Sequence, residues 1–210
     1  MNSNIRPVSG SLYVIAAPSG AGKTSLVKRI LETTENIAVS VSHTTRAPRP
    51  GEVNGEHYHF VDIPAFENMR DDGQFLEHAR VFDNYYGTSR QAVDALLQNG
   101  TDVILEIDWQ GAQQTRQLFP ECCSIFILPP SRHALEDRLR SRGQDDSSVI
   151  ERRMQDAITE ISHYNEFDYL VINDDFEEAL EMLRSIIIAR RQRVEVQSQR
   201  QEQLLHDLLS

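Results

Sequence analysis

Eight consecutive residues carry the clearest chemistry in this chain. They are Ala17, Pro18, Ser19, Gly20, Ala21, Gly22, Lys23 and Thr24. The apolar segment 11–16 before them is typical of a buried strand, and apolar residues at helical spacing over 24–33 predict a helix. A glycine-rich turn between a strand and a helix directs backbone N–H groups and the helix N-terminus at one point, and such a point binds phosphate.

Two side chains of this loop have separate tasks toward a bound phosphate chain. Lys23 would reach the β- and γ-phosphates, and the Thr24 hydroxyl would ligate Mg²⁺. The loop departs from the pattern G-x-x-x-x-G-K-[ST] at Ala17, which stands where the first glycine belongs. Alanine fits that place only if its φ stays negative. A chance glycine-rich turn is the alternative, and the strand–loop–helix order argues against it.

The charge of the chain limits its partners. A formal net charge of −11 over 210 residues argues against general binding to nucleic acid or to an anionic membrane, so an anionic substrate needs a local cationic pocket. Cys122 and Cys123 are adjacent and follow no metal or disulfide spacing, which suits a reducing compartment. The sequence has no long apolar N-terminal segment and no run that approaches a membrane span, so we expect a cytoplasmic protein.

Apolar runs and helical patterns alternate along the chain. Strands are expected at Leu12–Ala17, Ala38–Val41, Asp102–Ile107, Ser124–Leu128 and Tyr169–Ile172. Helices are expected at Ser25–Thr33, Ser89–Gln98, Gln110–Leu118, Arg132–Arg142, Ser147–Asn165 and Phe176–Arg193. This βαβ alternation predicts an α/β fold, in which helices flank a parallel sheet.

Three segments stand outside this alternation. Residues 43–88 are rich in Arg, Gly, His and Tyr, and we read them as an inserted α+β subdomain. The polar stretch 141–148 between two helical patterns has the composition of a mobile lid tip. Residues 194–210 carry leucines at helical spacing: Leu204, Leu205, Leu208 and Leu209. We expect a surface helix there, with association of copies into a homo-oligomer as the alternative.

The insert carries a second group of chemically informative residues. Arg46 and Arg49 flank a proline, which places two guanidinium forks on a stiff turn and suits a phosphate dianion. Glu77 follows, and then the segment N-Y-Y-G-T at residues 84–88.

Together these segments resemble the guanylate kinase family. Residues 44–58, T-T-R-A-P-R-P-G-E-V-N-G-E-H-Y, are similar to its signature, and F-L-E-H-A followed by N-Y-Y-G-T is similar to its nucleotide-binding segment. The runs I-L-E-I-D-W-Q-G, I-L-P-P, R-L-R-S-R-G and V-I-N-D-D match in the same order. The resemblance covers about residues 10–190. It implies phosphorylation of GMP to GDP by ATP, in purine nucleotide metabolism, with Mg²⁺ as the cofactor.

The resemblance also implies an architecture. The chain would have a P-loop nucleoside monophosphate kinase-like sheet flanked by helices, with core segments 10–42, 89–130 and 166–190. Residues 43–88 would form the GMP-binding insert and residues 131–165 a helical lid. Residues 191–210 would be a helical tail.

The resemblance assigns the acceptor site residue by residue. Ser42, Arg46, Arg49 and Tyr58 would hold the GMP phosphate, and Glu77, Tyr86 and Thr88 would form the base pocket. Guanine presents N1–H and 2-amino donors side by side, which one carboxylate can accept together. Adenine has a lone pair at N1 and no amino group beside it, and a site built on such hydrogen bonds discriminates by about 10⁴-fold or more.

Two acidic residues lie at the C-terminal end of an expected strand. Glu106 and Asp108 lie on the same side of it, because side chains alternate with period two. Ligands gather at the carboxyl ends of parallel strands. We place both carboxylates on the GMP side of the site and give Asp108, together with Thr24, to Mg²⁺ or its waters. The family usually has Asp at both positions, so Glu106 is a departure, and solvated surface charge is the alternative for either residue.

The lid would supply further cations. Arg138 and Arg142 are one helical turn apart and share a face, and Arg153 on the next helical pattern could converge with them. The resemblance implies that these arginines close over the ATP phosphates and act in catalysis with Lys23 and Arg46. Cationic groups stabilise the charge that spreads over the transferred phosphoryl group, and closure excludes water.

Three other functions stay open at this stage. The run Asp108–Gly111 mimics the D-x-x-G element of GTPases, but no N-K-x-D guanine reader is present, since Asn173 is followed by two aspartates in a stretch that resembles the family's adenine border. A non-catalytic interaction domain of guanylate kinase type would lack a working phosphate loop, which this chain has. A kinase of another small phosphate remains possible, although the two acceptor segments count against it.

Overall fold

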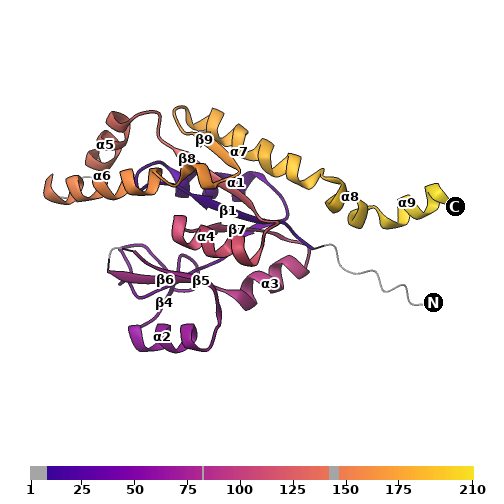
Figure 1. The fold of residues 1–210 in the computed structure, drawn as a ribbon, viewed down its shortest axis with the longest axis horizontal. Coiled ribbons are helices and arrows are strands. Elements are labelled where there is room, and N and C mark those ends of the chain that lie inside the picture. Colours follow the sequence, from indigo (N-terminus) through magenta and orange to yellow (C-terminus); the bar gives the residue numbers. More distant parts are fainter. Residues whose placement is uncertain (1–8, 82, 142–146) are drawn as a thin grey trace.

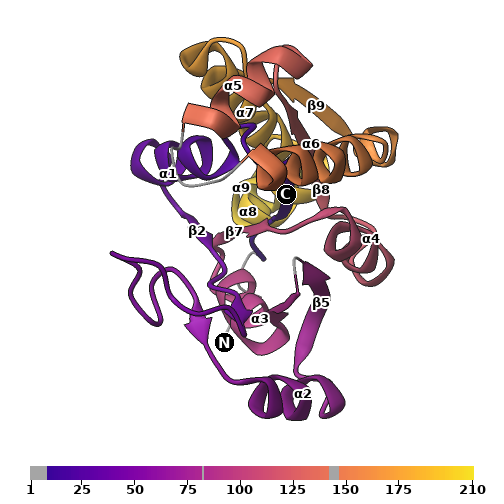
Figure 2. The ribbon, with the colours of Figure 1, turned by 90° about the vertical axis from the view of Figure 1, so that its left-hand side faces the viewer.

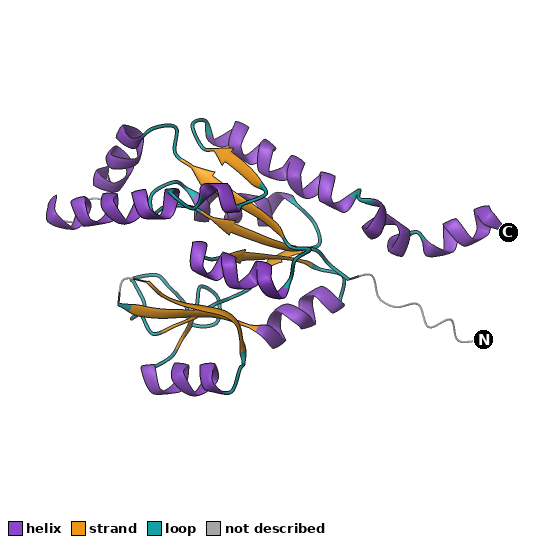
Figure 3. Ribbon diagram, in the orientation of Figure 1, coloured by secondary structure: helices purple, strands orange, loops and turns teal. Residues whose placement is uncertain are grey.

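The main sheet of the protein is parallel throughout. The structure, a computed structural model, describes residues 9–81, 83–141 and 147–210. Its strands run in the order β2 (Ile37–Val39), β7 (Asp102–Glu106), β1 (Leu12–Ala16), β8 (Cys123–Leu128) and β9 (Tyr169–Ile172), and every neighbouring pair is parallel. The α/β fold predicted from the sequence is confirmed (Figure 3).

Helices bury both faces of this sheet. The helices α1 (Lys23–Thr33) and α7 (Phe176–Arg191) cover one face, and α3 (Arg90–Gln98) and α4 (Trp109–Leu118) cover the other. Tyr13 and Ile15 pack toward α1 and α7, whereas their neighbours Leu12 and Val14 pack toward α3 and α4. Two buried faces explain why β1 is a continuous apolar run rather than an alternating one.

Residues 43–88 form an α+β insert, as predicted. The strands β3 (His43–Thr44), β4 (His59–Phe60), β5 (Phe75–Val81) and β6 (Asn84–Ser89) make a separate sheet in the order β4-β3-β6-β5, and α2 (Ile63–Asp71) packs against it. The rings of Phe66, Phe75 and Tyr85 stack between helix and sheet. Figure 2 shows the insert with α2 on one side of the main sheet and the lid helices on the other.

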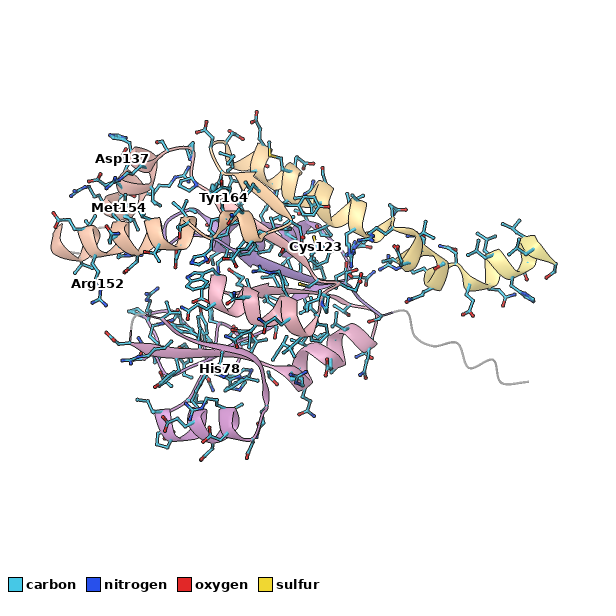
Figure 4. The ribbon with its side chains drawn as sticks, in the orientation of Figure 1. His78, Cys123, Asp137, Arg152, Met154 and Tyr164 are labelled. Carbon is cyan, nitrogen blue, oxygen red and sulfur yellow. The ribbon has the colours of Figure 1, made fainter. Side chains whose placement is uncertain are left out.

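The lid consists of α5 (Arg132–Ser141) and α6 (Ser147–Ile161). Its own small core contains Leu135, Leu139, Ile150, Met154 and Ala157. Figure 4 shows Met154 pointing from α6 toward α5. The lid tip predicted at 141–148 falls mainly on residues 142–146, which lie outside the described part of the chain.

The expected helix to Asn165 was too long. The helix α6 ends at Ile161, and a single turn of 3₁₀ helix, η1 (Tyr164–Glu166), follows. The intervening turn brings the ring of His163 onto that of Trp109 in α4, with centroids 3.6 Å apart and planes 6° apart. A continued α-helix would carry His163 along the axis of α6, so this contact with α4 ends the helix.

The chain finishes in two short helices that leave the body of the molecule (Figure 1). They are α8 (Val194–Arg200) and α9 (Glu202–Leu209). Leu208 and Leu209 are 72% and 88% exposed on this single chain, and the choice between a surface helix and association of copies stays a prediction. None of the described helices is both long and apolar enough to cross a membrane.

A buried ion pair between Asp102 and Arg191 lies at the end of the main sheet opposite the phosphate loop. Asp102 is fully buried. One carboxylate oxygen accepts the Ser11 N–H at 2.7 Å, and the other accepts Arg191 Nε at 2.7 Å. Arg191 also donates to the Glu35 carbonyl at 2.8 Å. The pair therefore ties α7 to strands β1 and β7 and to the turn before β2.

We predict that Arg191→Ala lowers the free energy of unfolding by about 3–5 kcal/mol, because it leaves the Asp102 carboxylate buried without its cationic partner. Urea denaturation measures the change. Arg193→Ala is the control, since Arg193 pairs with Glu195 on the surface and such pairs contribute about 1 kcal/mol or less. Equal losses in the two variants would contradict this role of Asp102.

Candidate functional site

The loop between β1 and α1 has the backbone that phosphate binding requires. Gly20 and Gly22 have φ values of 95° and 96°, which L-residues rarely adopt. Gly22 directly precedes α1, so the first N–H groups of this helix, which have no partner within it, are free to bind a ligand at the loop. Among the described non-glycine residues, only Asn36 and Asp83 have positive φ. Ala17 therefore keeps a negative φ, as its place in the motif demands.

Asn173, directly after β9, contacts the backbone of this loop. Its side-chain amide donates to the Ala21 carbonyl at 2.7 Å, and a Cβ atom on Gly22 would lie 2.3 Å from the same amide nitrogen. Its own carbonyl accepts Arg138 Nη2 at 2.9 Å. Asn173 thus joins the loop to the lid arginine, whereas the sequence placed it only at the adenine border.

The charge of Lys23 acts on three carboxyl groups that come from three other segments. They are Glu77 of the insert, Asp108 after β7 and Glu160 of α6. Burial raises the pKa of all three, to about 7 for Glu77 and about 7 for Glu160. The ammonium group of Lys23 pulls each of these pKa values back down. One lysine therefore acts on both halves of the site.

The carboxylates of Glu106 and Asp108 have different surroundings. Glu106 Oε2 lies 3.4 Å from the Thr24 hydroxyl, which donates to it. Asp108 Oδ1 accepts the Gly111 N–H at 2.9 Å and caps α4. The longer arm of Glu106 thus reaches the residue that the motif assigns to Mg²⁺. The assignment of Asp108 to the metal stays a prediction.

The oxygen atoms at this point fit a magnesium ion. Thr24 and Glu106 offer a hydroxyl and a carboxylate, which are hard oxygen ligands. Within the described ranges, no group of three or more His, Cys, Asp or Glu side chains could hold a metal by itself. Mg²⁺ commonly binds through one or two protein groups, several waters and nucleotide phosphates, so the small donor set agrees with a metal that arrives with a nucleotide.

Glu77 is fixed in the insert by its neighbours. It is 3% exposed, and the Thr88 hydroxyl donates to its Oε1 at 2.5 Å. A Cβ atom on Gly111 would lie 2.5 Å from its Oε2, so a side chain at residue 111 would displace this carboxylate. Ser42 Oγ lies 3.4 Å from Thr88 Oγ1. The predicted base pocket is therefore a meeting point of separate segments, which contribute Glu77, Thr88, Gly111 and Ser42.

The predicted phosphate clamp already contains an acidic residue. Arg46 Nη2 donates to both carboxylate oxygens of Glu52, at 2.8 and 3.0 Å, and the Arg49 N–H donates to Glu52 at 2.7 Å. The Arg46 guanidinium lies 5.4 Å from the centre of the Tyr58 ring, and the ring of Tyr86 meets that of Tyr58 at 6.0 Å. Glu52 orients Arg46, a role that we did not assign from the sequence although Glu52 lies inside the signature.

The lid arginines reach the loop from two elements. Arg138 of α5 contacts Asn173, and Arg153 Nη2 of α6 donates to Ser19 Oγ at 2.6 Å. Arg142 lies outside the described residues, so its predicted convergence with the other two is untested. Figure 4 shows Arg152 pointing out of α6 on the side of the insert.

The sequence analysis missed Glu160. Its Oε2 accepts the Ser19 N–H at 3.2 Å, so an acidic side chain of the lid contacts the phosphate loop. A single acidic residue in an amphipathic helix carries no signal that marks it for such a contact. Only the fold brings it to a residue 141 positions earlier.

Comparisons with known proteins agree with this arrangement. The family model described as guanylate kinase matches residues 9–190. The guanylate kinase of Chromohalobacter salexigens is 59% identical over 204 residues, which cover 97% of this chain and 95% of the relative. That of Escherichia coli K12 is 56% identical over 203 residues, or 96% and 98%. The crystal structure of guanylate kinase from Anaplasma phagocytophilum matches with a TM-score of 0.75 at 34% identity, over 90% of this chain and 89% of that one.

We predict that the Glu77 carboxyl titrates near pH 7 in the protein without nucleotide, because burial disfavours its charged form. Thr88→Val should raise this pKa further, since the hydroxyl hydrogen bond favours the ionised carboxylate. Carbon-detected NMR of the labelled glutamate carboxyl groups measures both values. A midpoint close to 4.5, the ordinary value for glutamate, would contradict the described burial.

Proposed function

This chain belongs to the guanylate kinase family and transfers a phosphoryl group from ATP to GMP; we propose that its residues divide this task between a donor site at the phosphate loop and an acceptor site on the insert. The observation that carries the division is that separate segments build the two sites: Gly20 and Gly22 shape the loop before α1, and Glu77 accepts from Thr88 within the insert. The charge of Lys23 lowers the pKa of Glu77 and also of Asp108 and Glu160.

The donor site binds the ATP phosphates. The N–H groups of the loop and the first turn of α1 receive the phosphate oxygens, and Lys23 contacts the β- and γ-phosphates. We assign Thr24 and Asp108 to Mg²⁺ and its waters, and we add Glu106, whose Oε2 accepts from the Thr24 hydroxyl. When bound, the ion supplies positive charge that neutralises the phosphate oxygens. Within the protein, Asn173 keeps the loop in its binding conformation through Ala21.

The acceptor site binds GMP. Ser42, Arg46, Arg49 and Tyr58 hold the phosphate, and Glu77, Tyr86 and Thr88 surround the base. Glu77 accepts the N1–H and 2-amino donors of guanine only when it is ionised. Because burial places the pKa of Glu77 at about 7, its affinity for guanine should decline as the pH falls below that value.

Transfer needs no covalent enzyme intermediate, because positioning and charge stabilisation supply the catalysis in this reaction class. A GMP phosphate oxygen attacks the γ-phosphorus, and the bond to the ADP oxygen breaks. Lys23, Arg46, Arg138 and Arg153 stabilise the charge on the transferred group. We include Arg142 on the resemblance of its motif alone. The lid excludes water, which would otherwise accept the phosphoryl group.

We also propose a cytoplasmic location and a role confined to free nucleotides. The formal net charge of −11 disfavours nucleic acid and anionic membranes as partners. ATP and GMP therefore depend on local cations, which gather at the two sites described above.

A coupled assay of ADP release tests the function directly. The purified protein with ATP and Mg²⁺ receives GMP, AMP, CMP or UMP as the acceptor. We expect GMP to be preferred by about 10⁴-fold or more in kcat/KM. Comparable rates with AMP or a pyrimidine nucleotide would overturn the assignment of the acceptor.

We predict that Lys23→Ala lowers kcat by about 100-fold or more, because it removes a preorganised charge from the transition state. The variant should keep its affinity for GMP at pH 8. At pH 6.5 it should bind GMP more weakly than the parent, since loss of Lys23 raises the pKa of Glu77. Turnover and calorimetry measure these effects. Lys28→Ala is the matched control, because Lys28 is the chain's only other lysine and lies exposed on α1.

We predict that Glu77→Gln lowers kcat/KM for GMP far more than for AMP, because the amide nitrogen then faces a guanine donor. Between pH 8 and 6 the parent should lose GMP activity as Glu77 becomes protonated. The variant lacks this titrating carboxyl group. The pH dependence of its GMP activity should therefore come only from the GMP phosphate, whose second pKa is about 6. An unchanged ratio of GMP to AMP activity would show that Glu77 does not read the base.

A further inference from the structure

The carboxylate of Glu160 has no task in the reaction described so far. It lies half-buried on α6, and its Oε2 accepts the Ser19 N–H in the phosphate loop at 3.2 Å. Burial, with Asp108 and Asp156, raises its pKa to about 7 against the opposing effects of Lys23 and of the Ser19 N–H. A partly buried carboxylate that contacts a loop for binding anions is an unexpected feature of this site.

Glu160 shares its contact with a lid arginine. Arg153 Nη2 donates to the hydroxyl of Ser19, whereas Glu160 accepts from the backbone N–H of the same residue. The two side chains stand seven residues apart on α6, which is about two helical turns, and so they share one face. The neighbouring side of α6 packs on α5 through Ile150 and Met154. Ser19 is therefore a shared point at which α6 meets the loop.

The chain after α6 is anchored elsewhere. The ring of His163 stacks on Trp109 of α4, and Glu166 accepts Arg116 Nη2 of α4 at 2.9 Å. Glu160 lies between this anchor and Arg153. A change in the contact between Glu160 and Ser19 would therefore tilt α6 about its base and displace Arg153.

We propose that Glu160 is a positioning residue for phosphoryl transfer: it fixes α6 on the phosphate loop through the Ser19 N–H and so determines where Arg153 meets the transferred group. This inference rests on the proposed function. This role depends on the length and the acceptor oxygen of the Glu160 side chain and not on its charge, because a negative charge at this point would repel the ATP phosphates. A neutral carboxyl group or an amide retains an acceptor oxygen.

Two variants separate length from charge. Glu160→Asp keeps the charge but shortens the side chain by one methylene, and it should lower kcat by about 10- to 100-fold, as expected when a catalytic group is displaced by about 1 Å. Glu160→Gln keeps the length and should stay within about threefold of the parent. Neither variant should change KM for GMP, because Glu160 does not touch the acceptor site. Glu151→Gln, on the exposed face of α6, is the control for loss of charge.

Amide hydrogen exchange provides a measurement that does not depend on activity. The Ser19 N–H should exchange faster in Glu160→Asp than in the parent and at a similar rate in Glu160→Gln, as read by NMR on the protein without nucleotide. If Glu160→Gln loses tenfold or more in kcat, or if Glu160→Asp retains parental kcat and exchange, the proposal is wrong. An inactive parent protein with the expected exchange pattern would instead point to failure of the proposed function.

Discussion

The charge balance between the Lys23 ammonium group and three buried carboxyl groups is the constraint on which the site depends. Lys23 lowers the pKa of Glu77, Asp108 and Glu160, yet burial keeps each of these pKa values above its ordinary range. A single positive charge cannot neutralise three negative ones in a poorly solvated place. Protons, a metal ion or a guanine base therefore change the charge balance of the site, and the metal ion and the base arrive with the substrates.

Such a site needs rigid supports, because unsupported carboxylates would turn toward water. The fold supplies one for each group. Glu77 occupies the space that a side chain on Gly111 would need and accepts from Thr88. Asp108 is fixed as the cap of α4, and Glu160 accepts from the backbone of Ser19. The parallel sheet brings the ends of β1 and β7 side by side, so the loop meets Glu106, the last residue of β7, and Asp108 just after it without any long connection.

The sequence predicted the features that are determined by residues close together in the chain. Glycines at fixed offsets and a strand–helix pattern identified Lys23 and Thr24, and the period of two along β7 placed Glu106 and Asp108 on one side. It did not predict which carboxylate approaches Thr24, because that depends on the longer arm of Glu106. It also missed Glu160 and the contact of Asn173 with Ala21, since these join residues 141 and 152 positions apart. The end of α6 was placed too late because a contact of His163 with α4, not a local signal, ends the helix.

The central claim is that Lys23 serves both halves of the site at once. A crystal structure of the complex with Mg²⁺ and a bisubstrate analogue, in which adenosine and guanosine are joined by a phosphate chain, tests it most directly. The account predicts the Lys23 ammonium group on the phosphates that connect the two nucleosides, with guanine on Glu77 and adenosine at the loop. A Lys23 side chain turned toward Asp108 or Glu160 and away from the phosphates, or a guanosine bound elsewhere than at Glu77, would contradict it.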